Sequence, residues 1–277
     1  MRRVLAFAAV LFWSLPLLGE RIPVAVSIAP LADFVAGVGG DMVEIEVLVP
    51  PGASPHTFTL KPAQMRFLSR ARLLVVVGLG LEFWLEDAVA AAGNPGLEVV
   101  VTSRGVKPLD SNPHIWLDPL LAVLQVASIR DALERVDPDH RLDYEINAAR
   151  YIGRLLELDA SIRKRVATWS HREFVAFHPA WVYFAARYGL VQAAVIEASP
   201  GKEPSPAEMA RIIDTVRRLK VRAVFAEPQF SPKAAQTIAA ETGVQVLFLD
   251  PLGGVPGRET YFQLMEYNLE QMEKALG

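Results

Sequence analysis

Short apolar runs alternate with amphipathic segments along two stretches of the chain. In the first stretch the runs cover residues 22–29, 43–49, 73–77 and 97–101, and in the second they cover residues 173–177, 190–197, 223–227 and 244–250. Such runs, separated by helical patterns as in 62–70, 83–92, 206–220 and 232–242, are typical of buried parallel strands in β-α units. The last two patterns each begin at a Ser-Pro pair, which fits a helix start. The pattern predicts an α/β protein with two Rossmann-like lobes, each built on a mainly parallel four-stranded sheet.

A third stretch, residues 138–169, separates these two regions and has helical periodicity. It contains no proline after Pro138, and its apolar residues recur every three or four positions, as in Leu142, Ile146, Ala149, Ile152 and Leu156. A helix of this length would span about 45 Å, and it is too polar to cross a membrane. We therefore expect one long helix that joins an N-terminal lobe, residues 20–137, to a C-terminal lobe, residues 170–277.

The first residues have the character of a secretory signal peptide. Arg2 and Arg3 precede an apolar stretch that ends near Gly19, and this stretch is shorter than the roughly 20 apolar residues of a membrane span. The chain contains no cysteine, so no thiol is present to accept a lipid after cleavage. We expect residues 1–19 to be removed and the mature protein to be soluble in the periplasm.

The overall composition is that of a globular protein. Hydrophobic residues make up 52% of the 277 residues and charged residues make up 21%. The formal net charge of −3 provides no positive surface for nucleic acid or an anionic membrane. We expect a monomer that has no nucleic-acid partner. Because cysteine is absent, any metal ligands must come from histidine, aspartate or glutamate.

Three of the five histidines adjoin a proline, and each follows a predicted strand: His56, His114 and His178. Asp250 ends another predicted strand and precedes a proline. Ligands of open α/β sheets bind outside the carboxyl ends of the strands. Two of these side chains come from each half of the chain, so a site in the cleft between the lobes could use all four. The other two histidines lie among charged residues, and we expect them on the surface.

Three imidazoles and one carboxylate suit a borderline divalent ion in four-coordinate geometry. We expect binding that weakens below about pH 6.5 as the histidines take up protons. The alternative function is that of an enzyme, a zinc hydrolase, in which an ion with an open coordination position activates water. The chain lacks a His-Glu-x-x-His helix, and a fourth protein ligand would close the site, so we expect no enzyme.

Several segments resemble the solute-binding proteins of zinc and manganese ABC importers. The similarity covers most of the chain after the predicted signal peptide, and its motifs occur in the family's order. They are Gly-Ala-Ser-Pro-His-Thr-Phe-Thr-Leu-Lys-Pro at 52–62, Asn-Pro-His-Ile-Trp-Leu-Asp-Pro at 112–119, Phe-His-Pro-Ala-Trp-Val-Tyr-Phe at 177–184, Glu-Pro-Ser-Pro at 203–206 and Phe-Ala-Glu-Pro-Gln-Phe at 225–230.

The resemblance implies two α/β lobes joined by a long helix, with the metal in the cleft between them. It implies His56 and His114 as ligands from the first lobe and His178 and Asp250 from the second. A histidine rather than a glutamate at the third of these positions implies zinc. The partner would be the membrane permease of an ABC importer together with its ATPase.

Some alternatives stay open at this level. Many zinc-binding members carry a His- and Asp-rich loop before the second ligand, whereas residues 102–113 contain no histidine. A manganese- or iron-specific binding protein and a metal-dependent adhesin therefore remain alternatives. Glu197 and Glu227 also end predicted strands and are alternative carboxylate ligands. Trp116 and Asp118 are placed to shield or orient His114.

Overall fold

The computed structural model describes residues 21–277. The predicted signal peptide, residues 1–19, lies outside the described residues. Within 21–277, none of the helices has both the length and the apolar character needed to traverse a bilayer.

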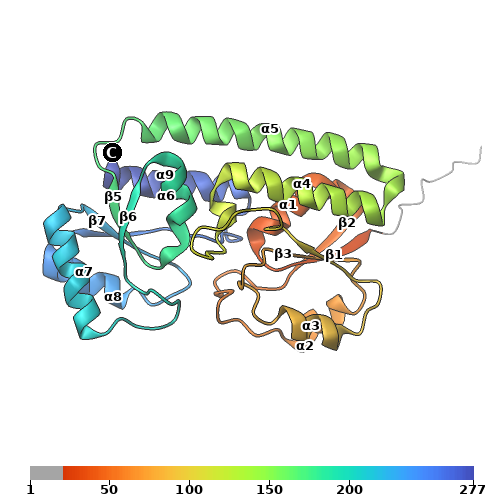
Figure 1. Cartoon of the computed structure of the whole chain (residues 1–277), viewed down its shortest axis with the longest axis horizontal. Helices are drawn as coiled ribbons and strands as arrows, with labels where there is room; N and C mark the ends of the chain where they lie inside the picture. Colours follow the sequence, from red (N-terminus) through yellow and green to blue (C-terminus); the bar gives the residue numbers. More distant parts are fainter. Residues whose placement is uncertain (1–20) are drawn as a thin grey trace, which may run out of the picture.

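Two four-stranded parallel sheets form the framework, as the sequence pattern predicts (Figure 1). The first has the order β2-β1-β3-β4 and the second the order β6-β5-β7-β8, so the first strand of each half lies between the second and third. The strands are β1 Ile22–Val26, β2 Val43–Val47, β3 Leu73–Val76, β4 Glu98–Val101, β5 Glu173–Ala176, β6 Val191–Val195, β7 Ala223–Ala226 and β8 Gln245–Phe248. The interior strands β3 and β7 are wholly buried, which explains their uninterrupted apolar sequences.

Helices follow the strands and cover the sheets. They are α1 Ala29–Gly39, α2 Pro62–Leu68, α3 Leu85–Ala92, α4 Pro119–Val136, α5 Arg141–Val166, α6 Val182–Tyr188, α7 Pro206–Leu219, α8 Lys233–Thr242 and α9 Tyr261–Leu276. The predicted start of α7 is confirmed, because the Ser205 side chain accepts a hydrogen bond from the Glu208 backbone and Pro206 is the first helical residue.

The long connecting helix is shorter than predicted, and it is not the only element that joins the two halves. A 3-10 turn occupies Pro138–His140, and α5 then runs for 26 residues above both halves (Figure 1). Helix α9 also reaches both halves. Its first residue, Tyr261, contacts Phe34 of α1 with ring centroids 5.0 Å apart, and its last residue, Leu276, accepts a hydrogen bond from the backbone of Ser170, just before β5.

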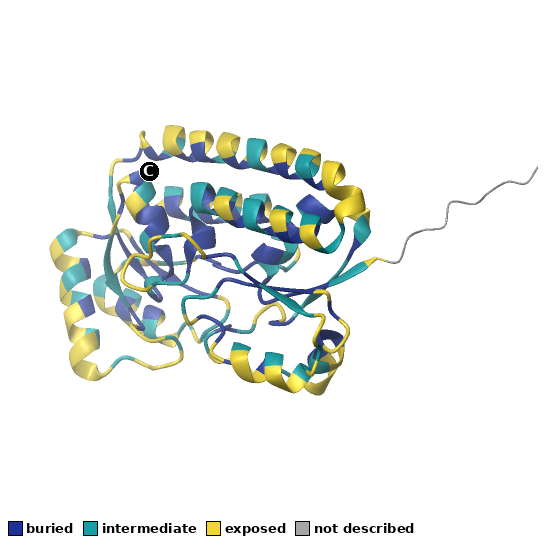
Figure 2. Cartoon of the chain, turned by 45° about the vertical axis from the view of Figure 1, so that its right-hand side comes forward, coloured by how far each residue is buried: buried dark blue, intermediate teal, exposed yellow. Residues whose placement is uncertain are grey.

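Both halves share one continuous hydrophobic core. Buried residues from α1, α4, α5, α6 and α9 form a single cluster that includes Phe34, Leu155, Trp181 and Tyr261. Figure 2 shows the facing sides of α4 and α5 buried and their outer sides exposed. A smaller second cluster lies between the second sheet and helices α7 and α8. Because the main core crosses the boundary between the two halves, a wide separation of the halves would expose apolar surface, which opposes hinge opening.

We predict that Gly37→Ala destabilises the protein although alanine favours helices. A Cβ atom on Gly37 of α1 would lie inside van der Waals contact with the ring of Tyr151 of α5. Overpacking of this kind costs about 1–3 kcal/mol. Gly153→Ala on α5 is the matched control, because a Cβ there meets nothing within 4 Å among the described residues, and it should gain about 0.5–1 kcal/mol. Thermal unfolding of both variants checks this, and equal changes in melting temperature would contradict the packing described.

Candidate metal centre

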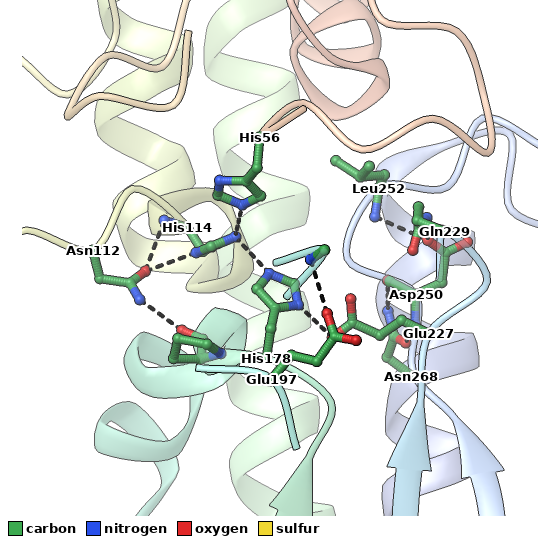
Figure 3. Close-up of polar contacts among 12 residues, drawn as sticks. His56, Asn112, His114, His178, Glu197, Glu227, Gln229, Asp250, Leu252 and Asn268 are labelled. Carbon is green, nitrogen blue, oxygen red and sulfur yellow. Dashed lines mark hydrogen bonds and ion pairs between the residues drawn. The ribbon is translucent and has the colours of Figure 1, made fainter. Parts of the chain in front are cut away.

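Three histidine rings meet where the carboxyl ends of the two sheets face one another (Figure 3). His56 Nε2 lies 3.1 Å from His114 Nε2, which in turn lies 3.0 Å from His178 Nε2. The possible ligand atoms of the three residues all lie within 4.8 Å of one another. Nitrogen ligands at 2.0–2.1 Å from a tetrahedral zinc ion are about 3.3 Å apart. The spacing of the rings is therefore close to that of three ligands around one ion.

Asn112 holds His114 in position. Its Oδ1 accepts a hydrogen bond from the His114 backbone at 3.0 Å and lies 2.9 Å from His114 Nδ1. Its Nδ2 donates to the carbonyl of Pro179 at 2.6 Å, which fixes the amide so that Oδ1 faces the imidazole. With Nδ1–H donating to Asn112, the lone pair of His114 lies on Nε2. Because Pro179 follows His178 directly, Asn112 also joins the two halves at the site.

Glu227 has the same role toward His178. His178 follows β5 in extended conformation, and its Nδ1 lies 2.7 Å from Oε1 of Glu227, the residue after β7. Donation from Nδ1 leaves the Nε2 lone pair facing the other rings. Oε2 of Glu227 is buried and has no hydrogen-bond partner among the described residues. Burial raises the pKa of this carboxyl group, whereas the contact with His178 lowers it. A buried carboxyl group with a free oxygen fits a site built for a cation.

Burial keeps two of the rings neutral. Desolvation, followed by the neighbouring His178, lowers the pKa of His56 to about 4. Desolvation, followed by His178 and His56, also lowers the pKa of His114 well below its usual value. At neutral pH both rings therefore present unprotonated nitrogens. For these two rings, burial moves protonation to a lower pH than the ordinary imidazole pKa near 6.5 on which the sequence-based expectation rests.

Apolar and aromatic side chains surround the rings. The Trp116 ring lies 5.1 Å from that of His114, and Phe230 lies 5.9 Å from His178. Together with Pro251 and Leu252 they line a pocket that has room for little more than an ion. Trp116 therefore shields His114, as the sequence suggested, and its Nε1 donates to the carbonyl of Pro251 at 2.7 Å.

Asp250 does not join the three histidines in this structure. Among residues 21–277, the group able to share one ion consists of His56, His114 and His178 alone. Asp250 Oδ1 accepts hydrogen bonds from Gln229 Nε2 at 2.9 Å and from two backbone nitrogens of the loop that follows, and Oδ2 lies 3.0 Å from Arg258 Nη1. These donors occupy both carboxylate oxygens, and Asp250 lies beside Gln229, apart from the three rings (Figure 3).

The other candidates have structural contacts. Glu197 accepts a hydrogen bond from the backbone of Gly201 at 2.8 Å. Asp118 caps α4 and forms an ion pair with Arg187 of α6 at 2.7 Å. Its contacts therefore join the first half to the second and do not orient His114. His140 is half exposed and pairs with Asp137, as expected for a surface residue. The aromatic residues that follow His178, including Trp181, are core residues.

The chain is similar to proteins that are named for zinc uptake or manganese binding. Residues 24–275 match the family model described as zinc-uptake complex component A, periplasmic. A crystal structure of ZnuA is 37% identical, with a TM-score of 0.85, and the match covers 92% of this chain and 99% of that one. The high-affinity zinc uptake system protein ZnuA of Bacillus subtilis (strain 168) is 27% identical, covering 93% of this chain and 88% of its own length. The manganese-binding lipoprotein MntA of Halalkalibacterium halodurans is 30% identical, covering 93% and 89%.

We predict that the metal-free protein loses stability as the pH falls from about 6.5 toward 4. The unfolded chain takes up protons on His56 and His114 near pH 6.5, whereas the folded protein does not until lower pH, so protons favour unfolding in this interval. Each proton difference contributes on the order of 1 kcal/mol per pH unit. Urea unfolding at pH 7, 6 and 5 should therefore show a smaller pH dependence for His56→Ala. His140→Ala, at an exposed site, should retain the wild-type slope, and equal slopes for all three proteins would contradict the lowered pKa.

Proposed function

We propose that this chain, which belongs to the ZnuA family of periplasmic zinc-uptake components, captures a divalent transition-metal ion, zinc by preference, and delivers it to an ABC importer. The observation that carries the proposal is the convergence of three imidazole rings, with Nε2 atoms 3.0 and 3.1 Å apart, in a small pocket. The ion is cargo, and the protein has to bind it reversibly.

His56, His114 and His178 are the proposed ligands. Three nitrogen donors suit zinc, because borderline ions favour imidazole, whereas manganese favours oxygen ligands. Asp250, which the sequence predicted as the fourth ligand, could join only by releasing Arg258 from its Oδ2. With three protein ligands the fourth position is left to water, and an ion held in this way is easier to pass on than one held by four protein groups.

A zinc hydrolase is the second candidate, because three histidines with an open position are also the pattern of a catalytic zinc site. Two observations oppose it. The pocket has little room beyond an ion, and its other walls are mostly apolar side chains such as Trp116, Phe230 and Leu252. Glu227, the nearest carboxyl group, is engaged with His178 Nδ1. We therefore favour transport, and hydrolysis of ester or peptide substrates by the zinc-loaded protein would reverse this choice.

The remaining assignments follow from the same proposal. The lobes extend over residues 20–137 and 170–277, with residues 138–169 between them. The mature protein acts outside the cytoplasm as a monomer, and its partners are the membrane permease and ATPase of the importer. Manganese- or iron-specific capture and metal-dependent adhesion are the alternatives within the same architecture. Growth of a deletion strain on limiting zinc separates transport from adhesion.

We predict that one zinc ion binds per chain and raises the melting temperature. A ligand present at a thousandfold excess over its Kd stabilises the folded state by about 4 kcal/mol. His178→Ala removes one of three ligands and should lose most of this stabilisation, while the metal-free variant stays folded. His140→Ala removes an exposed histidine and should respond to zinc as the wild type does. Native mass spectrometry and thermal unfolding, with and without zinc, check both statements, and full stabilisation of His178→Ala by zinc would place the metal elsewhere.

A further inference from the structure

Asp250 lies beside the metal pocket, but both of its carboxylate oxygens are engaged. The next two residues, Pro251 and Leu252, line the pocket, as does Gln229, which donates to Asp250 Oδ1. The second oxygen, Oδ2, lies 3.0 Å from Arg258 Nη1. The Asp250 side chain is 2% exposed, so water does not compete effectively for these contacts. A potential oxygen ligand is therefore present at the edge of the site but bound to other groups.

A tight turn brings Arg258 back over Asp250. The Gly254 backbone donates to the carbonyl of Arg258, and the Arg258 backbone donates to the carbonyl of Val255, each at 2.9 Å. Gly253 has a φ of 65°, and a Cβ there would lie 2.8 Å from the Arg258 carbonyl, so the turn requires glycine. The Arg258 guanidinium also packs over the Tyr267 ring at 4.5 Å. Its position is thus set by the loop and by α9, without any contribution from a metal.

We propose that Arg258 is a specificity-determining residue that favours zinc over manganese by keeping the Asp250 carboxylate out of the metal pocket. This inference rests on the proposed function. The group of described residues able to share one ion offers three imidazole nitrogens and no carboxylate oxygen, because Glu227, which also lines the pocket, lies outside that group. Three imidazole ligands suit a zinc ion, whereas manganese prefers oxygen ligands and a higher coordination number.

Loss of Arg258 would free one oxygen and leave the other in place. Oδ1 keeps its bonds from Gln229 Nε2 and from the backbone nitrogens of Leu252 and Gly253, at 2.9 to 3.1 Å. The backbone of Asp250 is held by Asn268, which bonds to its N and its O at 2.7 Å. Only Oδ2 is released, on a carboxylate that is otherwise held at the pocket edge, and it becomes available as a single additional ligand.

The test is the ratio of manganese to zinc affinity in a double-mutant cycle. Arg258→Met removes the charge and keeps a side chain that can pack on Tyr267. The wild type, R258M, D250N and the double variant are titrated with zinc and with manganese in competition with a chromophoric chelator. We expect R258M to bind manganese about tenfold more tightly relative to zinc, which corresponds to about 1.4 kcal/mol. We expect the double variant to lose this gain, because the new ligand is Asp250 itself.

Arg154→Met is the matched control. Arg154 also lies over an aromatic ring, that of Phe262 at 3.8 Å, but it is on α5 and does not line the pocket. It should leave the ratio unchanged. If R258M does not fold, Arg258→Gln is the second neutral variant, and it should shift the ratio in the same direction. An unchanged ratio in the folded neutral variant, or a gain that persists when Asp250 is also replaced, overturns the inference.

These outcomes differ from failure of the proposed function. If the wild type binds no zinc, or if His178→Ala binds it normally, the three-histidine site itself is wrong. If the wild type binds zinc through the histidines and the ratio does not respond to Arg258, only the role of Arg258 is wrong.

Discussion

The site depends on holding three imidazole rings close together in an apolar pocket. Their Nε2 atoms lie 3.0 and 3.1 Å apart, and the role of each nitrogen in these contacts depends on the tautomer of its ring. Asn112 holds Nδ1 of His114 and Glu227 holds Nδ1 of His178, so the Nε2 atoms of both rings face the same point. Burial favours the neutral form of His56 and His114, which is the form that can bind a cation. A site of this kind requires rings that are fixed firmly enough not to separate before an ion arrives.

Contacts between the two halves hold the rings in place. Asn112 bonds to His114 and to the carbonyl of Pro179, while Tyr183 donates to the Asn112 carbonyl at 2.6 Å. Around these contacts the main core continues from one half into the other through α1, α5 and α9. His56 differs from the other two rings, because it lies in the long loop between β2 and α2 and is only partly buried. The contacts described above hold His114 and His178 in place, whereas the position of His56 depends on this loop.

Much of this arrangement could be predicted from the sequence because it follows from local patterns. The apolar runs predicted all eight strands, and the proline-flanked histidines at strand ends predicted the three rings that lie together in the structure. The orientation of Asp250 could not be predicted in this way. The sequence shows that Asp250 follows β8. It does not show that the turn after Asp250 places Arg258 against its carboxylate, because such a contact leaves no repeating pattern in the sequence. Helix α9 was not predicted, and its contacts with both halves depend on tertiary packing that the order of residues along the chain does not show.

Charge near the site explains why two carboxyl groups at equivalent strand ends have different roles. Glu227 follows β7 and contacts His178 Nδ1, so it can stabilise the positive charge that an ion places on the ring without occupying a coordination position. Burial raises the pKa of Glu227 and so disfavours its charged form. A cation bound to His178 would favour the charged form, so ionisation of Glu227 would strengthen metal binding and metal binding would promote that ionisation. Asp250 follows β8 and is already neutralised by Arg258, so its charge does not act on the ion in the same way. In the proposed function, an ion at this site would be balanced by the Glu227 carboxylate through His178 and not by direct coordination to either carboxylate, which would leave one coordination position open for its release.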